Sequence, residues 1–384
     1  MELKYGCNPH QKPATLEVPD DAFRFLNGMP GYINMLDALG SWQLVQALKQ
    51  ATGLPGAASF KHVSPAGAAI ARPLTDALRA SQMLGDEDYS PVATAYIRAR
   101  AGDRMSSFGD VAAVSDTVDV SLAKLLNMEV SDLIVAPAFE PEALDILQQK
   151  KGGKFLIIQA DPDYTPPEVE TREVFGFTLR QRHDDSVITK ELFARSVAGE
   201  DIPEDIQETL VVATVALKYT QSNSVCLAYD GQVIGMGAGQ QSRVHCTRLA
   251  CGKAEKWLLQ QHPKTLGLKY KDGLMRAEKT NVVDQYLLWD ELSAPEMDAM
   301  LAGLAETPEP ITRDERMEWV KQQAGICLSS DAFIPFRDNI DRAGRTNVQY
   351  VAQPGGSARD ESVTEAAAGY GMKMIHTGIR CFLH

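Results

Sequence analysis

The sequence predicts an α/β fold in which mixed sheets are covered by helices. Two observations carry this prediction: short apolar runs alternate with longer helical patterns, and Asp230-Gly231, a pair typical of tight hairpin turns, joins two strand-like runs. The chain has 384 residues, of which 44% are hydrophobic. It is therefore long enough to bury the cores of two or three domains.

The first strand-like unit lies around a Lys-His pair. Residues 56–60 are small and apolar and predict a short buried strand, and residues 66–81 predict a helix that Ser64 and Pro65 would open. On this prediction Lys61 and His62 lie where a strand meets a helix, beside free backbone N–H groups.

A further strand-to-helix unit is followed by another strand. Residues 133–136 predict a buried strand, residues 142–151 a helix and residues 155–158 the next strand. Polar stretches that contain proline, at 161–170 and 261–270, are typical of hinges between packed units.

The C-terminal half is predicted to begin with the hairpin. Residues 224–229 and 232–235 are its strands, and a helix is expected at 247–261. Residues 374–384 predict a strand that ends with the chain, which would hold Arg380 and His384 in the body of the protein; the alternative is a frayed tail.

Composition excludes several classes of protein. The net charge of −13 and a sequence pI near 5.1 give no general attraction to nucleic acid or anionic membranes, so local basic residues must hold any anionic ligand. We find neither a secretory leader nor an apolar stretch near the roughly 18 residues of a membrane span, so a cytoplasmic location is expected. The six cysteines are scattered, which favours reduced thiols without a catalytic role.

Lys61 and His62 point to acyl chemistry. An amine that attacks a formyl group forms a tetrahedral oxyanion, which a cation stabilises while an imidazole removes the amine proton. An imidazole suits this task because its unperturbed pKa is about 6.5. The alternative is a surface Lys beside a His that caps a helix.

Gly235, Gly237 and Gly239 do not form a dinucleotide site, because the full fingerprint within a βαβ unit is missing. Close approach of two backbone segments explains them better, with Arg243 and the following helix start as donors to an anion. His245, Cys246 and Cys251 lack zinc-site spacing and are expected in the core. A phosphate-binding P-loop motif is also absent from the sequence, which argues against an ATP-driven ligase that uses that device.

Residues 329–341 combine aromatic side chains with carboxylates. A flat heterocycle could stack there and donate to an Asp, although ordinary core aromatics would give the same pattern. The loop at 353–360 offers hydroxyl and backbone donors, as many surface turns do.

Taken together, these motifs resemble the AICAR transformylase part of the bifunctional purine biosynthesis enzyme, where AICAR is phosphoribosylaminoimidazolecarboxamide. The resemblance extends over essentially the whole chain. The segments that carry it are 5–11, 26–34, 59–67, 218–224, 237–248 and 329–339.

The resemblance implies transfer of the formyl group of 10-formyl-tetrahydrofolate to the 5-amino group of AICAR, giving FAICAR and tetrahydrofolate in IMP biosynthesis. The implied fold is two cytidine-deaminase-like units without a zinc site, since the deaminase zinc signature is absent from the sequence. The first unit is expected at 1–166 plus 260–323, with a helical insertion, and the second at 167–259 plus 324–384.

The resemblance also implies roles for individual residues. His62 is expected to accept the proton, Lys61 to stabilise the transition state and Asn223 to align the reactants. The AICAR nucleotide is expected at Lys4, Tyr5, Asn34, Gly109, Asp132 and Arg243. The folate is expected at Val244, Phe333, Asp338, Ser357, Ala358 and Arg380. A potassium ion is expected near Thr220, Ser222 and Asp331, and no nicotinamide is implied.

Two departures from the family pattern affect these expectations. The family has Arg where this chain has Lys4, which replaces a bidentate phosphate contact by a point charge. The cyclohydrolase region that normally precedes this part does not occur in the sequence, so we expect no cyclohydrolase activity here and a separate IMP cyclohydrolase as partner. A homodimer with shared active sites is also implied, and neither nucleic acid nor membrane is expected as a partner.

Two alternatives stay open. The same nucleotide site could use another formyl donor, either formate with ATP or formyl phosphate. The chain could also be a non-catalytic AICAR-binding protein. Donor assays separate the first alternative, and binding without turnover would favour the second.

Overall fold

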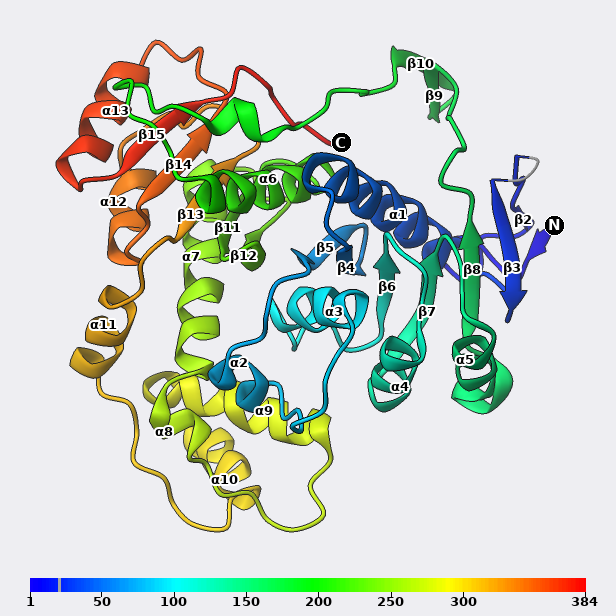
Figure 1. Cartoon of the computed structure of the whole chain (residues 1–384), viewed down its shortest axis with the longest axis horizontal. Coiled ribbons are helices and arrows are strands. Elements are labelled where there is room, and N and C mark those ends of the chain that lie inside the picture. The colour runs from blue at the N-terminus through cyan, green and yellow to red at the C-terminus, as the bar shows by residue number, and fades with distance from the viewer. Residues whose placement is uncertain (20–21) are drawn as a thin grey trace.

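The computed structural model describes residues 1–19 and 22–384, in which one large mixed sheet has helices on both faces (Figure 1). The described part of this sheet has 11 strands in the order β15-β14-β13-β11-β12-β5-β4-β6-β7-β8-β3. The strands are β3 (Phe23–Asn27), β4 (Gly56–Lys61), β5 (Ser64–Ile70), β6 (Asp110–Val114), β7 (Ser131–Ala136), β8 (Leu156–Ala160), β11 (Val225–Tyr229), β12 (Gln232–Gly237), β13 (Cys327–Ser330), β14 (Tyr350–Gln353) and β15 (Lys373–His376).

The sheet consists of two blocks. One block runs from β15 to β12 and the other from β5 to β3, and each contains both parallel and antiparallel neighbours. The blocks meet at β12 and β5 through one register pair, Gln232 opposite Ala69. Next to this pair the N–H of Ile70 donates to the carbonyl of Gly231 at 3.0 Å.

Helices cover the faces in three groups. α1 (Tyr32–Thr52) and α6 (Glu204–Lys218) lie side by side on one face, across both blocks. The opposite face is covered by α3 (Pro91–Ala101), α4 (Val120–Met128) and α5 (Pro141–Gly153) on one block, and by α7 (Arg243–Gln260), α12 (Asp338–Arg345) and α13 (Asp360–Gly369) on the other. Alternate strand residues enter these two layers, as expected for strands buried on both faces.

A helical segment outside the sheet has a small core of its own. The helices of this region are α2 (Asp76–Ser81), α8 (Pro263–Leu266), α9 (Arg276–Leu287), α10 (Ala294–Ala302) and α11 (Arg313–Lys321), with a short 3-10 turn at Trp289–Glu291 between α9 and α10. A second 3-10 turn, Lys190–Phe193, precedes α6. Tyr286, Met300 and Leu304 are buried in this satellite core, below the sheet in Figure 1.

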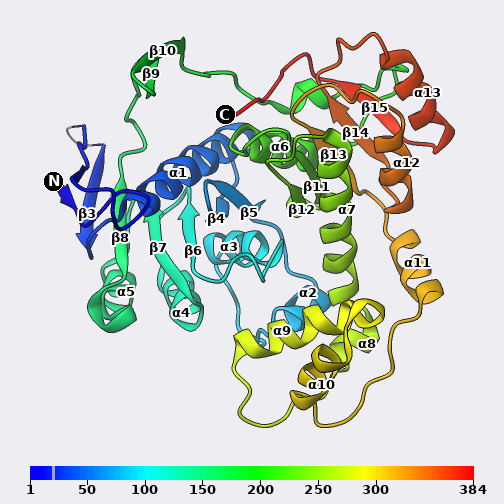
Figure 2. The ribbon, with the colours of Figure 1, turned by 180° about the vertical axis from the view of Figure 1, so that it is seen from behind.

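Two small sheets complete the structure. β1 (Glu2–Leu3) pairs with β2 (Ala14–Thr15) near the N-terminus. β9 (Val169–Val174) pairs with β10 (Phe177–Arg182), and every residue of both strands is exposed. This hairpin stands away from the body of the molecule (Figure 2).

Most predicted elements are confirmed, with shifted ends. The strands at 56–60, 133–136 and 155–158 correspond to β4, β7 and β8, and the helix at 142–151 corresponds to α5. Asp230-Gly231 joins β11 to β12 as predicted, and the helix expected at 247–261 begins earlier, at Arg243.

The helix predicted at 66–81 is wrong over most of its length. Residues 64–70 form β5, and only Asp76–Ser81 is helical. A Cβ on Gly67 would lie 2.0 Å from the carbonyl oxygen of Ala99, so small residues here let α3 pack on the sheet and do not indicate a helix. Lys61 and His62 therefore lie at a hairpin, not where a strand meets a helix.

The terminal strand is shorter than predicted, because β15 ends at His376. The residues beyond it are nevertheless attached to the body: the N–H of Cys381 donates to the carbonyl of Asp331 at 2.8 Å, and the N–H of Leu383 donates to Ser222 Oγ at 3.1 Å. Within the described part of the chain, none of the helices has both the length and the apolar character needed to cross a bilayer.

Candidate active site

The registers of the large sheet bring the predicted catalytic residues to one edge. Lys61 ends β4, and the antiparallel pairing of β4 with β6 puts it beside Asp110, where β6 begins. β7 runs parallel to β6, so Asp132 near its start lies at the same edge. The β4–β5 hairpin turn, with His62, projects from this edge.

The other block contributes to the same edge. Val225 pairs with Gly237 on one side and with Ser330 on the other, so the start of β11 lies between the ends of β12 and β13. Asn223 and Asp331 directly adjoin these strand ends. Because β14 and β15 run parallel to β13, their carboxyl ends and the loops that follow also lie here.

The ammonium group of Lys61 is held by main-chain carbonyls. Nζ donates to the oxygens of Phe108 at 2.5 Å and of Gly109 at 3.0 Å. Gly109 has a φ of 72°, and a Cβ at this position would lie 3.1 Å from Lys61 Nζ. Glycine at 109 therefore permits both the left-handed backbone and the close contact with the cation.

His62 lies in a strained turn. His62 and Val63 connect β4 to β5 with φ values of 52° and 54°, and both side chains are exposed. Residues with side chains rarely occupy this region, least of all a β-branched one such as Val63. Strain of this kind clusters at functional sites.

Beneath the turn lies Asp37 of α1, a buried residue that sequence reasoning missed. Its Oδ1 accepts from the N–H of Val63 at 2.6 Å, and the N–H of His62 also donates to the carboxylate. Burial raises the pKa of the Asp37 carboxyl above its ordinary value of 3.8, although these N–H groups and the charges of His62 and Lys61 act in the other direction. Asn34, one turn earlier on α1, lies on the same side of the helix.

Asp132 lies close to Gly109, since a Cβ on that glycine would be 3.8 Å from Asp132 Oδ2. Its other oxygen accepts from Lys151 Nζ at 2.5 Å. Lys151 is a second residue that the sequence did not indicate; it comes from the C-terminal end of α5. Lys61, Gly109, Asp132 and Lys151 thus form one polar cluster.

The guanidinium of Arg243 forms its contacts within the protein interior. Its Nη1 pairs with the fully buried carboxylate of Asp331 and donates to Ser330 Oγ at 3.0 Å, and its Nη2 donates to Asn223 Oδ1 at 2.7 Å. Asn223 Nδ2 donates in turn to the carbonyl of Gln240 at 3.1 Å. The guanidinium that was expected to meet an anion therefore fixes the orientation of the Asn223 amide.

The predicted close approach of Gly235 and Gly237 to another segment is confirmed. A Cβ on Gly235 would lie 2.1 Å from the carbonyl oxygen of Ala250, and one on Gly237 would lie 2.2 Å from that of Cys246. Side chains here would displace α7, whose first residue is Arg243. The glycines thus bring Arg243 to Asn223.

Some of the predicted folate residues share a cavity. A cavity of about 430 Å³ lies at the ends of β13, β14 and β15, and it is lined by Phe333, Pro354, Gly355, Gly356, Gly378 and Arg380. Ser357 and Ala358 follow it directly in the chain. Val244 and Asp338 do not line it; they lie in the first turns of α7 and α12, which Thr247 and Asn339 join by a hydrogen bond of 2.8 Å.

Lys4 and Tyr5 are set apart from the predicted folate residues around β13 to β15. They follow β1 in the small N-terminal sheet, at the opposite end of the molecule from β13 to β15 (Figure 1). Lys4 Nζ lies 5.9 Å from the centroid of the Tyr5 ring.

The oxygen atoms of the expected potassium site have partners within the chain. Thr220 Oγ1 donates to the carbonyl of Ala216 at 2.7 Å, and the carboxylate of Asp331 accepts from Arg243 and from the N–H of Ser224. A guanidinium on the same carboxylate supplies the charge that a cation would supply. These oxygen atoms give no support for a bound potassium ion. The potassium site stays a prediction, and the proposed reaction does not use it.

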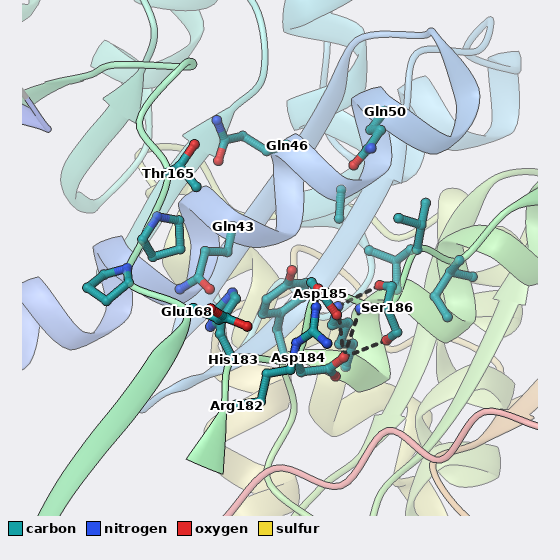
Figure 3. Close-up of a pocket in the computed structure, with 18 residues that line it drawn as sticks. Gln43, Gln46, Gln50, Thr165, Glu168, Arg182, His183, Asp184, Asp185 and Ser186 are labelled. Carbon is teal, nitrogen blue, oxygen red and sulfur yellow. Dashed lines mark hydrogen bonds and ion pairs between the residues drawn. The ribbon is translucent and has the colours of Figure 1, made fainter. Parts of the chain in front are cut away.

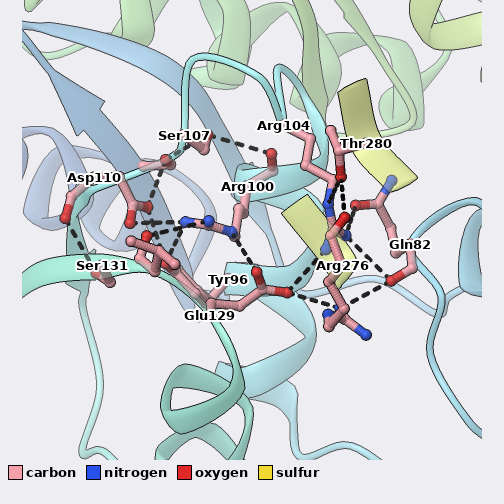
Figure 4. Close-up of polar contacts among 12 residues, drawn as sticks. Gln82, Tyr96, Arg100, Arg104, Ser107, Asp110, Glu129, Ser131, Arg276 and Thr280 are labelled. Carbon is pink, nitrogen blue, oxygen red and sulfur yellow. Dashed lines mark hydrogen bonds and ion pairs between the residues drawn. The ribbon is translucent and has the colours of Figure 1, made fainter. Parts of the chain in front are cut away.

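A buried ionic network supports the start of β6 (Figure 4). Arg100 Nη1 lies 2.8 Å from Asp110 Oδ1, and Glu129 lies 2.7 Å from Arg276 and 3.2 Å from Arg104. Burial lowers the pKa of Arg104 to about 10, against the opposing charge of Glu129. Asp110 follows Gly109 in the chain. The network therefore anchors the start of β6, which lies beside the cluster of Lys61 and Gly109.

Two other cavities lie near these elements. One of about 460 Å³, between α1, α6 and the base of the β9–β10 hairpin, is lined by polar side chains such as Gln43, Gln46 and His183 (Figure 3). The other, of about 680 Å³, adjoins Phe108 and the ionic network. Among residues 1–19 and 22–384, no three His, Cys, Asp or Glu side chains gather closely enough to hold a metal ion.

Comparison with known proteins identifies the family. The sequence profile described as AICARFT/IMPCHase bienzyme matches residues 1–253. The chain belongs to this family. A member from Roseobacter denitrificans, the bifunctional purine biosynthesis protein PurH, is 28% identical over 398 residues, covering 100% of this chain and 59% of that protein. PurH of Elusimicrobium minutum is 27% identical over 386 residues, covering 100% of this chain and 58% of that protein.

This AICARFT/IMPCHase family member therefore spans about three fifths of the curated relatives that it matches, 59% and 58% of their lengths. The expected relation to purine biosynthesis enzymes is confirmed at the level of the family.

Proposed function

We propose that this chain is a formyltransferase that moves the formyl group of 10-formyl-tetrahydrofolate to the 5-amino group of AICAR. The observation that carries the proposal is that Lys61, His62 and Asn223 all lie at the same edge of the sheet. Membership of the AICARFT/IMPCHase family supports the same reaction.

The proposed reaction assigns one task to each of these residues. The amine nitrogen attacks the formyl carbon, and His62 takes the proton that the amine loses. Lys61 stabilises the negative oxygen of the tetrahedral intermediate, which collapses when the bond from carbon to N10 of the folate breaks and N10 takes a proton. Asn223, with its amide held by Arg243, aligns the heterocycle.

The remaining site residues divide by chemistry. The polar cluster of Gly109, Asp132 and Lys151 beside Lys61 is proposed for the nucleotide. The cavity lined by Phe333 and Arg380 is proposed for the folate, because an aromatic face and a cation suit a flat ring with a carboxylate tail. We also propose that the two blocks of the sheet are cytidine-deaminase-like units.

The separation of these parts supports a homodimer with shared active sites. Four strand spacings lie between β4, which carries Lys61, and β13, which precedes Phe333, so the sheet alone separates them by roughly 20 Å. The formyl group must reach the amine beside His62. A second copy of the chain would supply the missing half of each site.

A turnover assay with AICAR and 10-formyl-tetrahydrofolate tests the proposed reaction. We expect FAICAR from the wild-type chain and none from His62→Ala, while AICAR binding is kept. The matched control is His183→Ala, which changes a half-buried histidine paired with Glu170 outside the proposed site. Full turnover by His62→Ala would remove His62 from the mechanism. Turnover only with formate and ATP, or only with formyl phosphate, would show that this compound, and not 10-formyl-tetrahydrofolate, is the formyl donor.

Mixing two impaired variants tests the shared site. His62→Ala is expected to be inactive and Phe333→Ala to be slow, and mixed dimers should recover part of the turnover because one of their two sites has both residues intact. Absence of recovery, with mixed dimers demonstrated, would place each complete site in one chain. Binding of AICAR without any turnover would favour a non-catalytic binding protein.

A further inference from the structure

We propose that Asp37 is a positioning residue for His62: its buried carboxylate holds the turn of His62 and Val63 in the conformation that presents the imidazole at the edge of the sheet. The inference rests on the proposed function, in which His62 accepts the proton of the amine. It adds a buried residue of α1 to the candidate site.

The surroundings of Asp37 give the first argument. Its side chain is buried, with 6% exposed, between α1 and the hairpin of β4 and β5. Its hydrogen-bond partners in the described part of the chain are the N–H groups of His62 and Val63. A carboxylate in the interior is costly unless it is hydrogen-bonded, so this contact accounts for an acid at this position.

The conformation of the turn gives the second argument. A two-residue turn with positive φ at both positions favours Asn and Gly, whereas this chain has His62 and Val63. The left-handed conformation carries an energetic cost for each such residue. Two N–H groups that converge on one carboxylate offset this cost, because they can do so only while the turn keeps its shape.

The cation of β4, Lys61, already has hydrogen-bond partners other than Asp37. Lys61 is the nearest cation on β4, and its ammonium donates to the carbonyls of Phe108 and Gly109. The Asp37 carboxylate thus holds the backbone of the turn, and it affects the position of the His62 imidazole through that backbone. Loss of the carboxylate should free the turn and misplace the proton acceptor, with little effect on the nucleotide contacts.

The test uses a double-mutant cycle on the full chain. Asp37→Ala is expected to lower kcat by at least about tenfold and to change the KM for AICAR by less than about twofold. Val63→Gly removes the cost of a positive φ, so Asp37→Ala should reduce kcat less in that background than in the wild type. Ser41→Ala is the matched control: Ser41 is a buried polar residue of α1 that donates to the carbonyl of Ala38, away from the turn.

Asp37→Asn keeps the volume and one acceptor, so it provides the comparison if Asp37→Ala does not fold. Wild-type kcat in both Asp37 variants would overturn the inference, and so would an equal loss in the two Val63 backgrounds. Amide hydrogen exchange at Val63 gives a readout without turnover, and it should be faster in the Asp37 variants. If the wild-type chain has no transferase activity, the proposed function fails, and unchanged exchange at Val63 would separately refute the role of Asp37.

Discussion

Arg243 Nη2 donates to Asn223 Oδ1 at 2.7 Å while the other arm of the guanidinium pairs with Asp331. This geometry makes one arginine responsible both for neutralising a buried carboxylate and for orienting an amide at the candidate active site. Asn223 consequently presents a fixed pattern of donor and acceptor at the edge of the sheet.

Removing Arg243 should therefore destabilise the fold as well as the site. Arg243→Ala leaves the carboxylate of Asp331 buried without its charged partner, and the expected loss is about 3–5 kcal/mol in the free energy of unfolding. Chemical denaturation measures it. Arg337→Ala breaks an exposed pair with Asp341 and should change stability little. Similar losses in the two variants would contradict the importance of the buried pair.

The ionic network around Glu129 should give stability a pH dependence. Burial acts to raise the pKa of Glu129, but Arg104, Arg100 and Arg276 outweigh it and hold the pKa below the ordinary value of 4.5. A depressed pKa stabilises the fold fully above that value, and the contribution is lost as the pH falls through the lower pKa of the folded state.

Glu129→Gln should remove this dependence. Denaturation at several pH values between about 3 and 6 is expected to show the largest difference between wild type and variant at the upper end, shrinking as the acid protonates. A difference that does not vary with pH would show that the charge of Glu129 contributes nothing.

Gly109→Ala tests the contact with Lys61. The new Cβ would lie 3.1 Å from Lys61 Nζ in a backbone with a φ of 72°. Gly53 has a φ of 71° and open space around it, so Gly53→Ala carries the same backbone cost without the contact. Both should lose about 1–2 kcal/mol of stability, and only Gly109→Ala should lose turnover. Equal turnover in the two variants would show that Lys61 tolerates the displacement.

Phe333→Ala tests the cavity at the ends of β13 to β15. If a flat ring stacks there, the KM for the folate should rise by about tenfold or more, since stacking is worth about 1–3 kcal/mol. Phe336 is also exposed but lies under Arg359 and does not line the cavity, so Phe336→Ala is the control. A steady-state titration of the folate measures both. An equal rise in the two variants would argue for a general effect of aromatic surface.

Sequence patterns predicted the elements whose own residues determine their local structure. The apolar runs of β7 and β8 and the Asp230-Gly231 turn are of this kind, and all three were predicted. The stretch from Ser64 to Ile70 misled, because its alanines favour a helix by propensity, whereas small residues also suit a central strand on which a helix packs closely. Only the contact of Gly67 with α3, which is tertiary, decides between them.

The candidate site divides in the same way. Lys61 and His62 are neighbours in sequence, so their chemistry could be inferred before the fold was known. Asp37 and Lys151 could not, because each reaches the site from a helix whose docking brings it there. An acid within an apolar helical face is the signal that could have identified Asp37.

The single register pair between β12 and β5 makes a seam across the molecule. Along most of the sheet, tilting one strand against its neighbour would break a ladder of main-chain hydrogen bonds, but at the seam very few stand in the way. Resistance to such a tilt comes mainly from side chains, above all where α1 meets α6. His62 and Asn223 lie on opposite sides of this line, so the distance between the proton acceptor and the aligning amide depends on side-chain packing at the surface of the sheet.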